Sequence, residues 1–404
     1  MILTKYKLRE ILDVTRGASL SGEYYATEGE YIRLTCGNFD YQNNCFKENK
    51  SKDNLYYVGD FKSEFLMEEG DIITPLTEQA IGLLGSTAII PESGKYIQSQ
   101  DVAKIICKED LLDKDFAFYL ISSALVKQQL SAAAQQTKIR HTSPDKIKDC
   151  TVWIPELSEQ KRIGKLLRSI DRKIELNRAI NQNLEAMAKQ LYDYWFVQFD
   201  FPNEEGKPYK SSGGEMVWNE KLKRKIPNEW DNCKLKDFIN LFDSKRIPLS
   251  SKDREERKGN YPYYGATGIM DYVNEYIFDG DYILLAEDGS TSDSKGFPIV
   301  QYIWGKNWVN NHAHIILPKN EQYLMFTYQM LRSIPAKQIE TGSIQKKISQ
   351  ENLCEYNMVL PNSILIEKYE SIISPLWEKR KLCIEEINAL IKQRDELLPL
   401  LMNG

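Results

Sequence analysis

Disulfide and zinc signatures are missing from this sequence of 404 residues. Its seven cysteines are odd in number and scattered, and no two of them form a C-x-x-C pair. This pattern excludes a zinc ribbon and a disulfide framework. It favours a reducing environment, and we therefore expect a cytoplasmic protein.

Long apolar runs and an excess of one charge are missing as well. The most apolar stretch, residues 72–91, is interrupted by Pro75 and Glu78, so we expect no membrane span. The first residues also lack the apolar segment of a secretion signal. With 53 basic and 58 acidic residues the net charge is −5, which excludes a wholly basic nucleic-acid coat but allows local basic surfaces.

Catalytic signatures are missing too. The sequence has no Walker A loop, no G-x-G-x-x-G, no H-E-x-x-H and no Asn-Pro-Pro-Tyr or Asp-Pro-Pro-Tyr motif. His312 and His314 stand two positions apart on one predicted strand face, but no third metal ligand is evident beside them. The acidic stretch 287–290 fits a turn. We therefore expect no catalytic residue and no metal site.

An internal repeat is present, and the length also predicts two or three domains. Three sequence elements recur in the same order, 227, 210 and 206 positions later: Lys7–Ile11 as Lys234–Phe238, Gly70–Ile73 as Gly280–Ile283, and Val152–Pro155 as Met358–Pro361. The slowly shrinking offset is what insertions and deletions produce in a duplicated unit.

A long helical pattern follows each copy of the last element. Its apolar residues keep a 4-3 spacing, which is the seam of a coiled coil, and the two seams correspond at an offset of 206. The predicted packing positions are Ile163, Leu167, Ile170, Ile174, Leu184 and Leu191 in the first helix, and Ile373, Leu376, Ile387, Leu390 and Leu397 in the second. Polar residues interrupt both seams: Asn177 and Asn181 in the first, Arg380 and Arg394 in the second. The alternative is an amphipathic helix lying on a globular domain.

The segments outside these helices have short apolar runs separated by Gly, Pro, Asn and Asp, which is typical of strands and turns. Helical stretches are expected at 115–135 and 323–332. The predicted layout is a first mixed unit (1–155), a helix (156–200), a linker with a second mixed unit (201–361) and a second helix (362–404). Within the third segment, residues 201–230 are interpreted as the linker.

Basic and hydrogen-bonding residues gather just before the last strand of each unit, in 135–141 and 341–347. Amides suit base edges and cations suit phosphates, so both clusters are candidate DNA contacts. A third candidate is the stretch 263–268 with basic residues upstream. The alternative for each cluster is a solvated loop. The candidate residues are Lys138, Arg140 and His141; Lys245, Arg246, Tyr263, Tyr264 and Thr267; and Ser343, Gln345, Lys346 and Lys347.

One segment carries a resemblance to a known family. Ile154-Pro155-Glu156-Leu157-Ser158-Glu159-Gln160, running into Ser169-Ile170-Asp171, resembles the central conserved region of the DNA specificity subunit of type I restriction–modification systems. Residues 280–286 and 308–314 look like motifs of its target-recognition domains. The second copy departs from the pattern, because Asn362–Ile366 replaces the Glu-Leu-Ser-Glu-Gln portion.

The resemblance implies an α+β fold in which two mixed α/β target-recognition domains form a pseudo-two-fold repeat, separated by two long antiparallel coiled-coil helices. Each domain would read half of a split target in double-stranded DNA. The subunit would bind no cofactor and catalyse nothing. Two modification subunits would supply S-adenosylmethionine-dependent adenine methylation, and restriction subunits would add ATP- and magnesium-dependent cleavage. The alternatives are a stand-alone nuclease and a coiled-coil scaffold.

Overall fold

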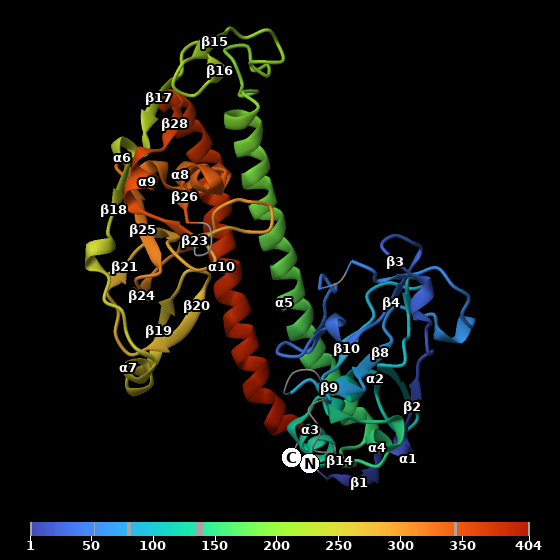
Figure 1. The fold of residues 1–404 in the computed structure, drawn as a ribbon. Coiled ribbons are helices and arrows are strands. Elements are labelled where there is room, and N and C mark those ends of the chain that lie inside the picture. The colour runs from blue at the N-terminus through green and yellow to red at the C-terminus, as the bar shows by residue number, and fades with distance from the viewer. Residues whose placement is uncertain (1, 52, 79–81, 134–139, 343–345, 403–404) are drawn as a thin grey trace. The chain divides into compact units, whose positions relative to one another are not determined.

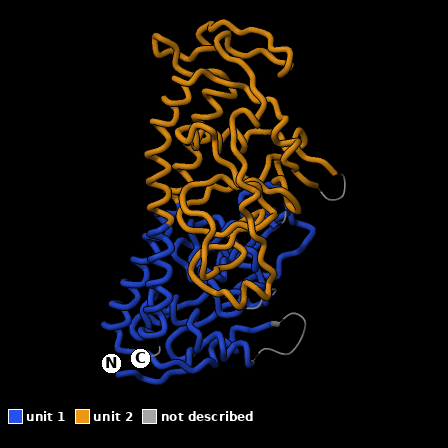
Figure 2. The backbone as a smooth tube through the Cα atoms, turned by 90° about the vertical axis from the view of Figure 1, so that its left-hand side faces the viewer, with its two compact units in different colours: residues 1–178, 385–404 blue, residues 179–384 orange. Residues whose placement is uncertain are grey.

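The protein divides into two compact units in the computed structural model, which describes residues 2–51, 53–78, 82–133, 140–342 and 346–402. Unit 1 comprises residues 1–178 and 385–404, and unit 2 comprises residues 179–384 (Figure 2). Each unit contains helices and sheets, as the sequence predicts. No helix among the described residues is both long and apolar enough to cross a membrane.

Unit 1 is built on two four-stranded sheets (Figure 1). The first has the order β10-β8-β12-β2 and consists of Ala88–Ile89, Ile72–Pro75, Val102–Cys107 and Leu12–Arg16. The second has the order β11-β4-β7-β3 and consists of Tyr96–Ile97, Tyr31–Arg33, Tyr56–Tyr57 and Tyr25–Ala26. Three further strand pairs are β1 (Thr4–Lys7) with β14 (Thr151–Ile154), β5 (Phe39–Asp40) with β6 (Cys45–Phe46), and β9 (Thr77–Glu78) with β13 (Arg140–His141).

Short helices complete unit 1: α1 (Leu8–Ile11), α2 (Lys114–Ile121), α3 (Ala124–Ala133) and α4 (Pro144–Lys148), with 3₁₀ turns at Gly22–Tyr24, Cys36–Asn38 and Ser63–Phe65. The single helix expected at 115–135 is therefore two helices, interrupted at Ser122 and Ser123. The Ser122 hydroxyl donates to the carbonyl of Phe118 at 3.1 Å, a local bond that competes with continuation of the helix.

Unit 2 repeats the main sheet. Its order β23-β22-β25-β18, made of Val300–Ile303, Tyr282–Ala286, Ala313–Pro318 and Ile239–Leu241, matches β10-β8-β12-β2 strand for strand. Its second sheet has the order β20-β19-β24-β21, made of Ile269–Val273, Lys258–Tyr264, Lys306–Val309 and Phe278–Asp279. Three two-stranded pairs are β17 (Asp231–Lys234) with β28 (Asn357–Leu360), β26 (Glu340–Thr341) with β27 (Lys347–Ile348), and β15 (Met216–Asn219) with β16 (Arg224–Pro227). The repeat read from the sequence is thus confirmed in the fold.

The helices of unit 2 are α6 (Leu235–Phe238), α7 (Ser251–Glu256), α8 (Leu324–Ser333) and α9 (Gln350–Glu355), with 3₁₀ turns at Asp243–Lys245, Glu321–Tyr323 and Ala336–Gln338. The segment 201–230 is more than a linker. It contains the β15–β16 hairpin, and at its ends Phe201 and Trp230 are buried with their ring centroids 5.0 Å apart. Both rings belong to the core of unit 2, so this segment is part of that unit.

Two long helices run antiparallel to one another within each unit. They are α5 (Leu157–Tyr192), which continues into a π-helical turn at Asp193–Val197, and α10 (Ser363–Met402). In unit 1 Asp171 faces Arg394, and in unit 2 Glu185 faces Arg380. All eleven predicted seam residues are buried or half-buried, as a coiled-coil seam requires.

The last turns of α10 belong to the core of unit 1. Met402 is buried there, and Leu397, Leu398 and Leu401 pack against the same cluster, which also contains Phe116 and Leu167. The hydrophobic core of unit 1 is therefore built from both ends of the chain.

Candidate nucleic-acid interface

The two basic clusters occupy matching places in their own units. In unit 1 the amide of Thr142 donates to the carbonyl of Leu76 at 2.9 Å, and in unit 2 the amide of Ile348 donates to the carbonyl of Glu287 at 2.8 Å. Leu76 and Glu287 each follow the second strand of the main sheet, β8 and β22. The residue that follows each cluster is therefore bonded at the same place in both units.

A serine cap follows each cluster at the same distance. Ser143 accepts a hydrogen bond from the amide of Lys146 and starts α4, while Ser349 accepts from the amide of Asn352 and starts α9. Serine at this position satisfies an amide that the first helical turn leaves without a partner. These caps fix the backbone just after each cluster. The two units therefore share the same cap at this point, as the predicted repeat implies.

Residues of the first cluster are described only in part. Lys138 and the side chain of Arg140 lie outside the described residues, although the backbone of Arg140 pairs with Glu78 in β13–β9. His141 is exposed, and its Nδ1 atom lies 3.4 Å from the Thr77 hydroxyl.

The second cluster presents two lysines. Lys346 and Lys347 are both exposed, and each ammonium has a carboxylate partner: Lys346 lies 3.0 Å from Glu340, and Lys347 lies 3.1 Å from Glu287. Ser343 and Gln345 lie outside the described residues. Both lysine side chains are 53% exposed, so they are accessible to a DNA phosphate, whereas their partners Glu340 and Glu287 are only 7% and 14% exposed.

Arg246, a predicted DNA contact, is directed into the protein. Its guanidinium donates to the carboxylate of Glu287 at 2.7 Å and to the carbonyl of Ala313 at 2.8 Å, and its side chain is only 12% exposed. The neighbouring Lys245 is exposed, with its ammonium 5.1 Å from the Phe242 ring centroid. The geometry makes Arg246 a support for the candidate interface and leaves Lys245 free to approach a ligand.

Beneath Arg246 lies a buried pair, Asp243 and His314. The Nδ1 atom of His314 lies 2.6 Å from Asp243, and Nε2 lies 2.8 Å from the carbonyl of Ile348. Burial opposes ionisation of Asp243, but the bond to His314 and its charge, with the amides of Ile315 and Gln350, outweigh it and lower the pKa of Asp243. This pair ties the strand after the second cluster to the sheet.

Asp243, Glu287 and His314 offer ligand atoms within 4.8 Å of one another, which is a spacing that a metal ion can occupy. Here these atoms already bond to Arg246, Gln350 and Lys347 or to backbone groups. Burial opposes ionisation of Glu287 as well, but Arg246, His314 and Lys347 lower its pKa. Cationic partners take the place of a metal, and we interpret the cluster as a charge network.

Sequence reasoning interpreted Glu287 as part of a turn and missed this network. Its members come from five separate segments of unit 2, namely the turn after β18, the end of β22, the start of β25, β27 and the start of α9. The acidic stretch 287–290 after β22 was the one local signal that could have indicated it.

The third candidate stretch is a hairpin between β19 and β20. Tyr263 is 1% exposed, packs with Val273 and Trp308, and accepts a hydrogen bond from the amide of Leu249 at 3.0 Å. It supports the hairpin from within and does not reach the surface. Tyr264 is half-buried, and burial raises its pKa to about 12. Thr267, at the tip, is exposed.

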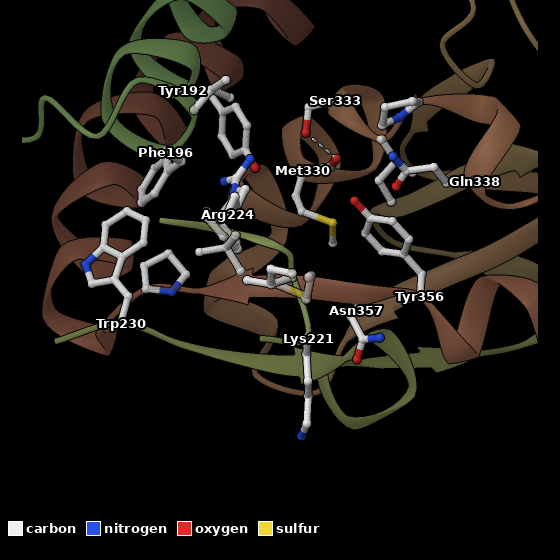
Figure 3. A pocket seen from close by; sticks show the side chains of 18 of the residues that line it. Tyr192, Phe196, Lys221, Arg224, Trp230, Met330, Ser333, Gln338, Tyr356 and Asn357 are labelled. Atoms are coloured by element: carbon white, nitrogen blue, oxygen red, sulfur yellow. Dashed lines mark hydrogen bonds between the residues drawn. The ribbon is translucent and has the colours of Figure 1, made fainter. Parts of the chain in front are cut away.

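A separate cavity of about 500 Å³ lies in unit 2 (Figure 3). Tyr192, Phe196 and Trp230 line it together with Arg224, and burial lowers the pKa of Arg224. The Ser333 hydroxyl on its wall donates to the carbonyl of Met330 at 2.7 Å. None of the candidate DNA contacts that the structure describes lines this cavity.

Comparison with protein families gives a match over most of the chain. The model of the type I restriction modification DNA specificity domain matches residues 3–186 and again residues 227–386. The two matches correspond to the two copies of the repeat.

Individual relatives agree with this result. The type I restriction enzyme MjaIX specificity subunit of Methanocaldococcus jannaschii is 23% identical over 326 residues, covering 76% of this chain and 72% of that protein. A putative type I specificity subunit of Haemophilus influenzae is 34% identical over 142 residues, 35% of each chain. Among solved structures, the S subunit of a type I system from M. genitalium superposes with a TM-score of 0.63 at 18% identity, covering 100% of this chain and 96% of that one.

Proposed function

Since this chain belongs to the type I restriction–modification DNA specificity family, we propose that each of its units reads one half of a bipartite target in double-stranded DNA. As a specificity subunit the chain performs no chemistry of its own. It directs adenine methylation and restriction, which partner subunits carry out.

The observation that carries the proposal is the matched position of the two basic clusters. The residue after each cluster makes the same backbone hydrogen bond, Thr142 to Leu76 in unit 1 and Ile348 to Glu287 in unit 2. Two copies of one reading surface on one chain fit a target made of two blocks. Lysine contacts to phosphate would position each unit, and hydrogen bonds to base edges would specify sequence.

The charge network of unit 2 supports this role. Lys347 approaches Glu287, and Ile348 is held by His314, so the described end of the second cluster is fixed to the sheet. A fixed base positions the contacts that read a sequence, because specificity requires side chains to be held close to their bonding geometry.

The partners we propose are two modification subunits and, in a complete restriction system, motor-nuclease subunits. S-adenosylmethionine, ATP and magnesium would be bound by these partners. An apolar groove between α5 and α10 in unit 2, lined by Met187, Leu191, Tyr194, Ile372 and Leu376, offers a place for an amphipathic helix of such a partner. Such a complex would work on DNA in the cytoplasm.

The decisive experiment maps methylated adenines genome-wide with and without this chain, in cells that carry its modification subunit. We expect a two-block target that is methylated only when the chain is present. A chain that acts as a nuclease or as a scaffold would leave the methylation pattern unchanged when it is removed.

A further inference from the structure

In unit 1 the contact between the two long helices is centred on a buried ion pair. The carboxylate of Asp171 accepts hydrogen bonds from Arg394 at 2.9 Å and from the Tyr119 hydroxyl at 2.5 Å. The side chains of Asp171 and Arg394 are 10% and 7% exposed. A charge this deeply buried is tolerated only when its partner is present.

The same two positions of the repeat are apolar in unit 2. At the offset of 206 that relates the two helices, Asp171 corresponds to Trp377 and Arg394 corresponds to Ala188. Trp377 and Ala188 are fully buried in one apolar core, where the Trp377 ring lies 5.2 Å from the Tyr328 ring. The two positions that hold an ion pair in unit 1 are thus both apolar and buried in unit 2.

A second pair of positions makes the opposite exchange. In unit 2 Glu185 bonds to Arg380 at 3.2 Å and pairs with Arg332 at 2.9 Å. Their counterparts in unit 1, at the same offset, are Ile391 and Ile174. Ile174 is buried and Ile391 packs against the same small apolar cluster. Each unit therefore has one polar and one apolar pair of positions. The pair that is polar in one unit is apolar in the other.

We infer that this exchange makes the helix of the first half select the helix of the second half as its partner, in preference to a copy of itself. The two pairs of positions together favour the pairing of α5 with α10. The partner that fits α5 is α10, whether it comes from the same molecule or from a second copy. This inference concerns how the chain assembles, and it is independent of what the units bind.

A pair of two α5 helices or of two α10 helices, which we call a like pair, would break both contacts that a mixed pair of α5 with α10 makes. Two copies of α5 would place Asp171 opposite Ala188 and Ile174 opposite Glu185, leaving the buried carboxylate of Asp171 and the half-buried carboxylate of Glu185 without their arginines. Two copies of α10 would place Arg394 opposite Trp377 and Arg380 opposite Ile391. Because a like pair is symmetric, each mismatch would occur twice. Buried charges without partners are strongly unfavourable, so mixed pairs should exceed like pairs by at least ~100-fold.

The test uses the full chain, cut once after folding. A protease site is inserted between Glu205 and Gly206, which are both exposed in a turn outside the helices. The cleaved protein, in two preparations with different isotope labels, is unfolded in urea, mixed and refolded. Native mass spectrometry then counts the pairs. We expect particles with one fragment of each kind, with the labels fully exchanged. Like and mixed pairs in equal amounts would overturn the inference.

A matched variant reverses the preference. Glu185→Ile combined with Ala188→Arg gives the first fragment the side chains that Asp171 and Ile174 meet in unit 1. This variant should form like pairs of that fragment, whereas the control Glu175→Ile with Ala179→Arg, at two exposed positions of α5, should not. If the Glu185 and Ala188 variant still forms only mixed pairs, the selection lies elsewhere and the inference is wrong.

A second measurement avoids refolding of fragments. In the uncut chain, urea unfolding is compared for Asp171→Ala, Arg394→Ala and the double variant. We expect strongly non-additive midpoints, with the double variant more stable than the sum of the single losses predicts. Additive losses would show that the two side chains are not coupled, and they would remove the basis of the inference.

Discussion

The Nδ1 atom of His314 lies 2.6 Å from the Oδ2 atom of Asp243, and the two side chains are 0% and 4% exposed. The other ring nitrogen lies 2.8 Å from the carbonyl of Ile348, so each ring nitrogen faces an oxygen atom. The main sheet, the turn after β18 and the strand that follows the second cluster all meet at this pair.

Removing one member of this pair should destabilise unit 2. Asp243→Asn should lower the free energy of unfolding at pH 7 by about 3 kcal/mol, because it removes a buried carboxylate that bonds to His314, Ile315 and Gln350. The pKa of Asp243 is lowered in the folded state. Its contribution is therefore present at neutral pH and is lost as the pH falls through the acid range.

The matched control for this variant is Asp288→Asn. Asp288 also bonds to a histidine, His312 at 2.7 Å, but both side chains are exposed. This variant should change stability by less than about 1 kcal/mol. Urea unfolding of the two variants side by side provides the comparison, and equal losses would contradict the role assigned to the buried pair.

Glu370 should make stability depend on pH in the opposite sense. Burial raises its pKa to about 7, although the amide of Phe326 donates to it at 2.7 Å. Because the folded state holds this proton more tightly than the unfolded state does, its contribution is complete below about pH 4.5 and is lost as the pH rises through about 7.

Glu370→Gln keeps an acceptor for Phe326 and removes the titration. It should be more stable than the parent at pH 8, by up to about 3 kcal/mol, and similar to it at pH 4. The exposed Glu367 provides the control variant Glu367→Gln. Thermal unfolding at both pH values measures the difference. A Glu370→Gln variant that tracks the parent at every pH would show that this carboxylate does not titrate as described.

The two basic clusters should act on separate halves of the target. Lys346→Ala should weaken binding at the second half-site, and Arg140→Ala should weaken binding at the first. A lost phosphate contact should reduce affinity for every sequence and lower the salt slope by about 1, whereas a lost base contact should cost ~1–3 kcal/mol at one position. Competition binding with targets altered in one block at a time separates these effects.

Lys223→Ala is the control for the cluster variants, because Lys223 is exposed in the β15–β16 hairpin and pairs with Glu220 at 2.9 Å. It should leave the recognition of both blocks unchanged. If Lys346→Ala impairs both blocks equally, the assignment of this cluster to one half-site is wrong.

The isolated chain should be catalytically silent. We expect no methyl transfer and no cleavage when the purified protein is incubated with DNA, S-adenosylmethionine, ATP and magnesium, because the sequence has no motif for these reactions. Methylation should appear when the modification subunit is added. Cleavage by the chain alone would favour the nuclease alternative.

The length of the helices should set the gap between the two blocks of the target. Inserting four residues after Asn181 and after Ile387 adds about 6 Å to each helix, close to two base-pair steps of ~3.4 Å, and keeps the seam nearly in phase. We expect methylation-site sequencing to show a longer gap with both blocks unchanged. An unchanged gap with retained activity would show that the helices do not determine the spacing.

The features that the sequence predicted were periodic ones. The eleven seam positions and the repeat offset follow from spacing along one chain, and the structure buries or half-buries every one of those residues. Placing Arg246 and Tyr263 required the fold, because their partners Glu287 and Leu249 are set by strand pairing and loop closure. Exposure of a basic or aromatic residue is a tertiary property that composition does not determine. For the same reason the hairpin in 201–230 was interpreted as a linker.

The order of translation determines when unit 1 can complete its folding. Its sheets are translated before α10, yet Leu397, Leu401 and Met402 of its core lie in the last turns of α10. Until they arrive, the apolar surface around Leu167 and Phe116 stays uncovered. A premature stop codon in the last two turns of α10 would therefore damage the domain that was made first, and such truncated products should be captured by chaperones through unit 1.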